Sequence, residues 1–169
     1  MSVVGAALVA VTMLGSCAHS RQAGGSASSP APAPSGPDRS ALVRSIGQEC
    51  TWYGGLQVTV LSVTRRDRDA PAGQAGYVVA VRVVNHTPKG FATGGLTMQL
   101  WLGGAQAPAT GDDRGALGRG LPNQVVAPGK RVSGDYGFTV SRRRASSTVA
   151  VGLKPDPVVQ QCVLKGRAG

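Results

Sequence analysis

Apolar and polar residues alternate with a period of two through most of the chain between Gly47 and Lys165. Successive side chains of a β-strand point to opposite faces, so this period is typical of strands with one buried and one solvent-facing side. No comparable stretch has the spacing of an amphipathic helix with capping residues. The clearest alternating runs are 56–63, 77–83, 96–102, 132–140, 149–153 and 158–164.

Turn-forming residues separate these runs. An Asn-centred segment, Asn85 to Gly90, follows the second run, and Pro128-Gly129 precedes the fourth, where Pro fixes φ and Gly permits a positive φ. The parity of the apolar residues changes near Leu61, which indicates a β-bulge. A further short strand is expected around residues 105–109, inside the long irregular stretch 103–124.

Roughly six or seven strands in about 120 residues are enough for one shared core. The sequence therefore predicts an all-β fold, an immunoglobulin-like antiparallel sandwich of two sheets, over residues 47–169.

Three segments of this domain carry a resemblance to a known group of proteins. They are a long strand that ends at an Asn-centred turn, Tyr77–Asn85, a Pro-Gly turn, Val126–Lys130, and a strand with an aromatic residue, Gly134–Val140. Their order resembles the telokin-like, immunoglobulin-like domains of exported bacterial proteins, including the immunoprotective extracellular proteins. The resemblance covers most of 56–164 and implies the sandwich fold. It brings no catalytic residues, since the better-known members are secreted antigens or accessory domains.

The N-terminal segment resembles the signal and lipobox of bacterial lipoproteins. Its apolar run is too short to cross a bilayer, which needs about 20 residues, and matches the apolar core of a secretory signal. The run ends in Leu14-Gly15-Ser16-Cys17, a branched apolar residue, two small residues and the cysteine that such proteins acylate. The resemblance implies a signal peptide at 1–16 and a lipid on Cys17, which would anchor the protein to the extracytoplasmic face of the cell membrane. The alternative is a plain secreted protein cut near Ala18.

Residues 17–46 are rich in Gly, Ser, Ala and Pro and contain almost no large apolar side chain before Leu42. Such a segment cannot bury enough surface to offset its chain entropy. We therefore expect a flexible tether between the lipid and the sandwich. The first cation of the chain, Arg21, lies in this tether, whereas secretory signals usually open with Lys or Arg. A basic segment upstream of Met1 is one interpretation.

Acylation of Cys17 would leave two of the three cysteines, Cys50 and Cys162. Exported proteins meet an oxidising compartment and the ends of a domain often lie close together, so we expect this pair to form a disulfide. Two buried thiols are the alternative. Trp52 and Tyr53 follow Cys50 closely, which favours an aromatic ring stacked on the disulfide.

The chain carries 18 Lys and Arg against 8 Asp and Glu, for a net charge of +10. A basic surface attracts polyanions, and for an exported protein these are anionic lipid head groups and acidic envelope polymers rather than nucleic acid. Two clusters stand out, Arg65-Arg66-Asp67-Arg68 and Arg142-Arg143-Arg144. No aromatic residues interleave with them, as a stacking platform for single-stranded nucleic acid would need. Solvated turns are the alternative interpretation of both clusters.

Trp101 has the outward parity on its strand. Either a loop covers this ring, or the ring forms an exposed contact with a ligand or partner. We treat Trp101, Arg142, Arg143 and Arg144 as the candidate contact residues.

Few residues suit catalysis or metal binding. His19 and His86 are the only histidines, whereas a catalytic zinc or copper site usually draws on two or three. Asp112-Asp113 is a close carboxylate pair in a Gly-rich stretch, but its spacing is not that of a known calcium loop. A Ca²⁺-binding or enzymatic protein that uses this pair with His86 is the alternative function.

These observations favour a non-enzymatic surface lipoprotein that needs no cofactor and no metal. Its sandwich is expected to bind an envelope protein, an anionic polymer or a lipid. A structural accessory domain that contacts only its own complex is a further interpretation.

We expect the mature protein of the membrane fraction to begin at Cys17 and to carry the mass of acyl chains, which mass spectrometry of the intact protein measures. The Cys17→Ala variant should carry no acyl mass and should keep residues 1–16, because the cysteine is the group that is modified. Ser20→Ala, a control beside the lipobox, should be processed like the wild type. A free, unmodified Cys17 in the mature wild-type protein would contradict the lipoprotein interpretation.

Overall fold

The computed structural model describes residues 41–109 and 117–169. The predicted signal peptide and lipobox with Cys17, most of the predicted tether, and Asp112-Asp113 lie outside these residues. The described residues form an all-β fold with short 3-10 turns and no α-helix. Among them, no helix is long and apolar enough to cross a membrane.

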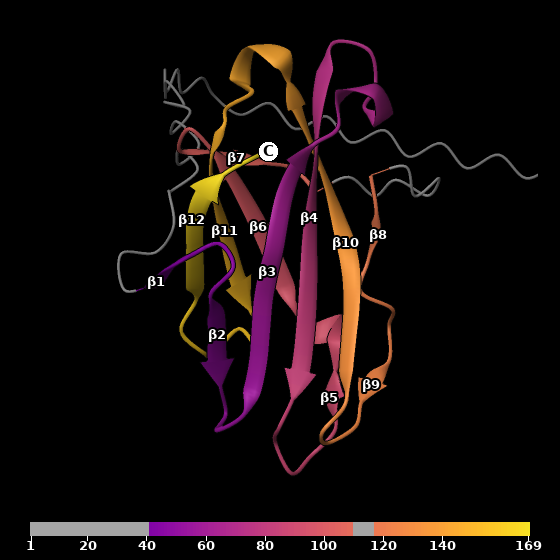
Figure 1. Ribbon diagram of the computed structural model, residues 1–169, viewed down its shortest axis with the longest axis vertical. Coiled ribbons are helices and arrows are strands. Elements are labelled where there is room, and N and C mark those ends of the chain that lie inside the picture. The colour runs from indigo at the N-terminus through magenta and orange to yellow at the C-terminus, as the bar shows by residue number, and fades with distance from the viewer. Residues whose placement is uncertain (1–40, 110–116) are drawn as a thin grey trace, which may run out of the picture. The chain divides into compact units, whose positions relative to one another are not determined.

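Two five-stranded sheets pack as layers (Figure 1). The first sheet has the order β1 (Leu42–Ser45), β12 (Cys162–Arg167), β11 (Thr148–Lys154), β6 (Thr97–Leu102) and β7 (Ala105–Ala107). The second has the order β2 (Glu49–Trp52), β3 (Leu56–Arg65), β4 (Gln74–Asn85), β10 (Arg131–Ser141) and β8 (Arg119–Gly120). A small ladder joins β5 (Phe91–Ala92) to β9 (Val125–Val126), and the 3-10 turns are η1 (Asp67–Asp69), η2 (Thr93–Gly95) and η3 (Arg142–Arg144).

The core lies between the two sheets and is built from the apolar positions of the alternating runs. On β4, Tyr77, Val79, Val81 and Val83 are fully buried, and the residues between them are more exposed. Burial of each such side chain contributes about 1.5–3 kcal/mol relative to leaving it in water. The predicted two-sheet sandwich is therefore confirmed.

Several local predictions are also confirmed, while two boundaries differ. The register of β3 against β4 shifts between Val60 and Ser62, which places the expected bulge at the exposed Leu61. Strand β7 occupies the expected position in the long loop. The last strand begins at Cys162, since Val158 is 87 % exposed and precedes it in a turn.

Strand β1 lies within the segment predicted to be a tether. It pairs in parallel with β12, from Leu42 opposite Cys162 to Ser45 opposite Lys165, and its four residues are all exposed. The sandwich therefore begins at Leu42 rather than at residue 47. Because neither face of this short edge strand is buried, it has no alternating pattern that could have marked it.

A disulfide joins Cys50 on β2 to Cys162 on β12, with the two Cα atoms 6.2 Å apart. The bond links the second sheet to the first, and both cysteines are 1 % exposed. It closes a loop with a sequence separation of 112 residues, for which loop entropy sets a contribution of about 4–5 kcal/mol at most. The Trp52 ring packs against the core and donates from Nε1 to the carbonyl of Gln160 at 2.9 Å. Tyr53, by contrast, is 53 % exposed.

Asn85 is a fully buried polar residue at the end of β4. Its Nδ2 donates to the carbonyls of Lys89 at 2.7 Å and Val126 at 2.8 Å. Its Oδ1 accepts from the backbone N–H of Thr87 at 3.0 Å and from the Thr87 hydroxyl at 2.7 Å. The side chain thus organises the turn after β4 and ties it to β9. The sequence predicted the turn but not the burial of its asparagine.

We expect Asn85→Asp to lower the free energy of unfolding by about 3 kcal/mol or more. The variant keeps the acceptor but loses both Nδ2 donors, and it places a carboxylate beside the carbonyls of Lys89 and Val126. Thr87→Val, which removes one hydroxyl from the same turn, should cost only about 1 kcal/mol. Chemical denaturation of the disulfide-bonded protein measures both changes. A loss below about 1 kcal/mol for Asn85→Asp would show that this side chain does not hold the turn.

Candidate functional site

The two arginine clusters of the sequence meet at one end of the sandwich. Strand β3 ends at this end, β4 begins there and β10 ends there, because β4 is antiparallel to both neighbours. Turns η1 and η3, which follow β3 and β10, therefore lie at the same end as the C-terminus (Figure 1). We call this surface the basic end; its cations are Arg65, Arg66, Arg68, Arg142, Arg143 and Arg144.

Backbone contacts hold the two turns against the start of β4 and the loop that precedes it. The N–H of Arg66 donates to the carbonyl of Gly76 at 2.8 Å, and that of Arg142 donates to the carbonyl of Gly73 at 3.1 Å. The buried Tyr77 holds the chain after η3, since its hydroxyl donates to the Ser146 carbonyl and accepts from the Ser146 N–H, each at 3.0 Å. The arginines thus project from anchored turns.

One carboxylate at the basic end is already bound. The Arg65 guanidinium contacts Asp67 in a two-pronged arrangement, with Nε to Oδ1 at 2.9 Å and Nη2 to Oδ2 at 2.7 Å. This hydrogen bonding and the Arg65 charge, with a smaller contribution from Arg142, hold the pKa of Asp67 below its usual value. Arg66 and Asp69 make a looser pair at 3.9 Å.

The other arginines of the basic end keep their charge unneutralised. Within residues 41–109 and 117–169, neither Arg68, Arg143 nor Arg144 makes an ion pair, and Arg142 donates from Nε to the carbonyl of Gln74 at 3.2 Å. All six arginine side chains belong to exposed residues. The solvated-turn interpretation of each cluster is correct locally, while their convergence creates a surface that can bind an anion.

Trp101 does not belong to this surface. It lies on β6 with the expected outward parity, but it is 4 % exposed, so the ring is covered and makes no exposed contact. The ring lies over Gly152 on β11, where a Cβ atom would stand 2.6 Å from Cζ3. Gly152 provides the space that the indole occupies.

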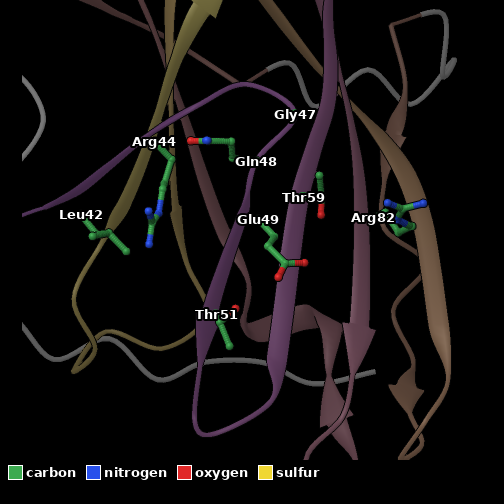
Figure 2. A pocket seen from close by; sticks show the side chains of 8 residues that line it. All are labelled: Leu42, Arg44, Gly47, Gln48, Glu49, Thr51, Thr59 and Arg82. Atoms are coloured by element: carbon green, nitrogen blue, oxygen red, sulfur yellow. The ribbon is translucent and has the colours of Figure 1, made fainter.

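A second polar surface lies on the outer face of the second sheet (Figure 2). A hollow of about 570 Å³ is bounded by Arg44 from β1, Glu49 from β2, Thr59 from β3 and Arg82 from β4. A neighbouring hollow of about 450 Å³ shares Glu49, Thr59 and Arg82 and extends to the start of β10. We call the two hollows together the polar trough; its further lining residues include Gln48, Thr51, Gln57, Lys130 and Arg131.

Of the candidate metal and catalytic residues, His86 alone lies in the described part of the chain. His86 is an exposed turn residue, and residues 41–109 and 117–169 contain no group of three or more metal-ligating side chains. Asp112 and Asp113 lie outside these residues, so the Ca²⁺-dependent alternative stays a prediction from the sequence.

Comparisons with known proteins bear on the fold. No protein-family model and no curated protein matches the chain. Among solved structures, a candidate lipoprotein (ycdA) of Bacillus subtilis is 17 % identical with a TM-score of 0.54; the match covers 71 % of this chain but only 38 % of that protein. An uncharacterised β-sandwich protein of Clostridium difficile is 10 % identical with a TM-score of 0.51, over 79 % of this chain and 99 % of its own. The chain is thus similar in fold to β-sandwich proteins.

Proposed function

We propose that this protein is a lipid-anchored, non-enzymatic binding protein of the bacterial cell envelope, whose sandwich holds an anionic polymer at the basic end. One observation carries the proposal. Two arginine clusters that lie far apart in the sequence converge on one end of the sandwich, and only Asp67 and Asp69 accompany them in these turns.

The proposed location rests on three independent features. The lipobox at Cys17 implies a lipid anchor, and the Pro-rich tether implies a flexible linker between this anchor and the sandwich. The disulfide between the two sheets suits an oxidising, extracytoplasmic compartment. A candidate lipoprotein of Bacillus subtilis shares the fold. Membership of the telokin-like group, with the immunoprotective extracellular proteins, would fit the same location.

The chemistry of the basic end favours a polymer that bears phosphate or carboxylate groups. A guanidinium presents a planar fork of donors that matches both groups, and it stays charged at every physiological pH. Arg65 already shows this mode of binding with Asp67. Because the surface is exposed, each contact is weak and is screened by salt, so several charges must act together.

The triple variant Arg142→Gln, Arg143→Gln, Arg144→Gln should bind polyglycerol phosphate roughly tenfold more weakly than the wild type at low salt, since three exposed contacts of about 0.5 kcal/mol each are lost. Asp67→Asn should strengthen binding about twofold, because it frees Arg65 and removes a repelling carboxylate. Affinity measured over a range of salt concentrations checks both directions.

A second triple variant serves as the matched control. Lys89→Gln, Arg119→Gln, Lys154→Gln removes the same charge from positions away from the basic end and should lose much less affinity. An equal loss in the two triple variants would overturn the proposal, since net charge alone would then account for binding.

A further inference from the structure

The polar trough has its charges arranged in order across the strands. The register places Glu49 of β2 opposite Thr59 of β3, Thr59 opposite Arg82 of β4, and Arg82 opposite Ser133 of β10. Across the trough stand Arg44 of β1, then the Glu49 carboxylate, and then the Arg82 guanidinium. Glu49 and Arg82 are two strands apart, about 10 Å at the backbone. Figure 2 shows the Arg82 side chain directed away from Glu49 and toward β10.

Arg82 lacks an acceptor for a buried donor. Its Nε is buried and has no hydrogen-bond partner, and its guanidinium makes no ion pair within the described residues. A buried N–H of a charged group without an acceptor is costly, and folded proteins rarely leave one. Lys130 and Arg131 line the same part of the trough and add positive charge. An anionic group at this side would supply the acceptor that the Arg82 N–H lacks.

The other side of the trough suits a hydrogen-bond donor. The Glu49 carboxylate accepts from Nε2 of Gln57 at 3.3 Å, which fixes it on the sheet surface. Thr59, 7 % exposed, adds a hydroxyl between the carboxylate and the guanidinium. No aromatic side chain lines either hollow, so the trough offers hydrogen bonds and charge rather than a stacking face.

From this arrangement we infer that the polar trough is a second binding site, distinct from the basic end, for a hydroxyl-bearing polyanion such as a sugar-acid or polyol-phosphate chain. The anionic group of one unit accepts from Arg82, supported by Arg131. Hydroxyl groups of the neighbouring unit donate to Glu49. A polyanion without hydroxyl groups can satisfy only the first of these contacts.

The test measures binding by the full chain in detergent at about 0.5 M salt, where screening reduces the Debye length toward 3 Å and weakens the exposed basic end. The probes are oligogalacturonate, oligoglycerol phosphate and, as the unhydroxylated comparison, polyphosphate of equal charge. The wild type should bind at least one hydroxylated probe more tightly than polyphosphate. The probe that binds better identifies the anionic group as a carboxylate or a phosphate.

Two variants assign that binding to the trough. Arg82→Lys keeps the charge but removes Nε and the planar fork, and it should lose roughly tenfold in affinity. Thr59→Val keeps the shape of the side chain and removes one hydroxyl, so its loss of affinity should be smaller than that of Arg82→Lys. The basic-end triple variant should bind the hydroxylated probe like the wild type at this salt, which separates this inference from the proposed function.

Thermal unfolding identifies a variant that fails to fold. Glu49→Gln then replaces that variant, and it should bind the hydroxylated probe more weakly than the wild type while its affinity for polyphosphate stays unchanged. Unchanged binding in folded Arg82→Lys, or equal binding of polyphosphate and both hydroxylated probes by the wild type, would overturn the inference.

Discussion

The structure depends on the pairing of β4 with a strand on each side. Antiparallel ladders join this strand to β3 over most of its length and to β10 from Gln74 opposite Ser141 to Val84 opposite Arg131. One face of β4 supplies five fully buried core residues, Ala75, Tyr77, Val79, Val81 and Val83, and the other face presents Arg82 to the polar trough. The turns η1 and η3 lie at the end of the sandwich where β4 begins, and the last residue of β4 is the buried Asn85. The position of each candidate site therefore follows from one set of ladders.

The second layer is held to this unit by packing and by one covalent bond. Apolar residues of β6, β11 and β12 complete the core, and Cys50–Cys162 links the sheets at β2 and β12. The disulfide lies close to the point where the chain enters the sandwich, since β1 pairs with β12 from Leu42 opposite Cys162. A pull on the N-terminal segment would thus meet a covalent restraint a few residues into the domain.

Much of the fold could be predicted from the sequence because half-buried strands leave a period of two. The runs of β3, β4, β6, β10 and β11, the bulge at Leu61 and the cysteine pair were all predicted. Strand β1 was missed because its four exposed residues have no periodicity. The sequence did not predict whether Trp101 is covered or exposed. The parity of a strand residue indicates the face on which its side chain lies but not what packs over that face.

The candidate sites were less predictable than the fold. The two arginine clusters are visible in the sequence, but their convergence depends on which strands are neighbours, and that is a non-local property. Arg82 signalled only an outward-facing position, and its unpartnered Nε depends on the packing around it. The burial of Asn85 likewise follows from contacts with Val126, which lies far along the chain.

Binding at the basic end can be mapped directly by NMR, from the backbone amide shifts of the disulfide-bonded protein during titration with polyglycerol phosphate at low salt. We expect the largest shifts on residues 65–69 and 142–146 together, because these two turns form one surface. Small shifts spread over all the lysines and arginines, or shifts confined to one of the two turns, would show that the two arginine clusters do not form one binding surface.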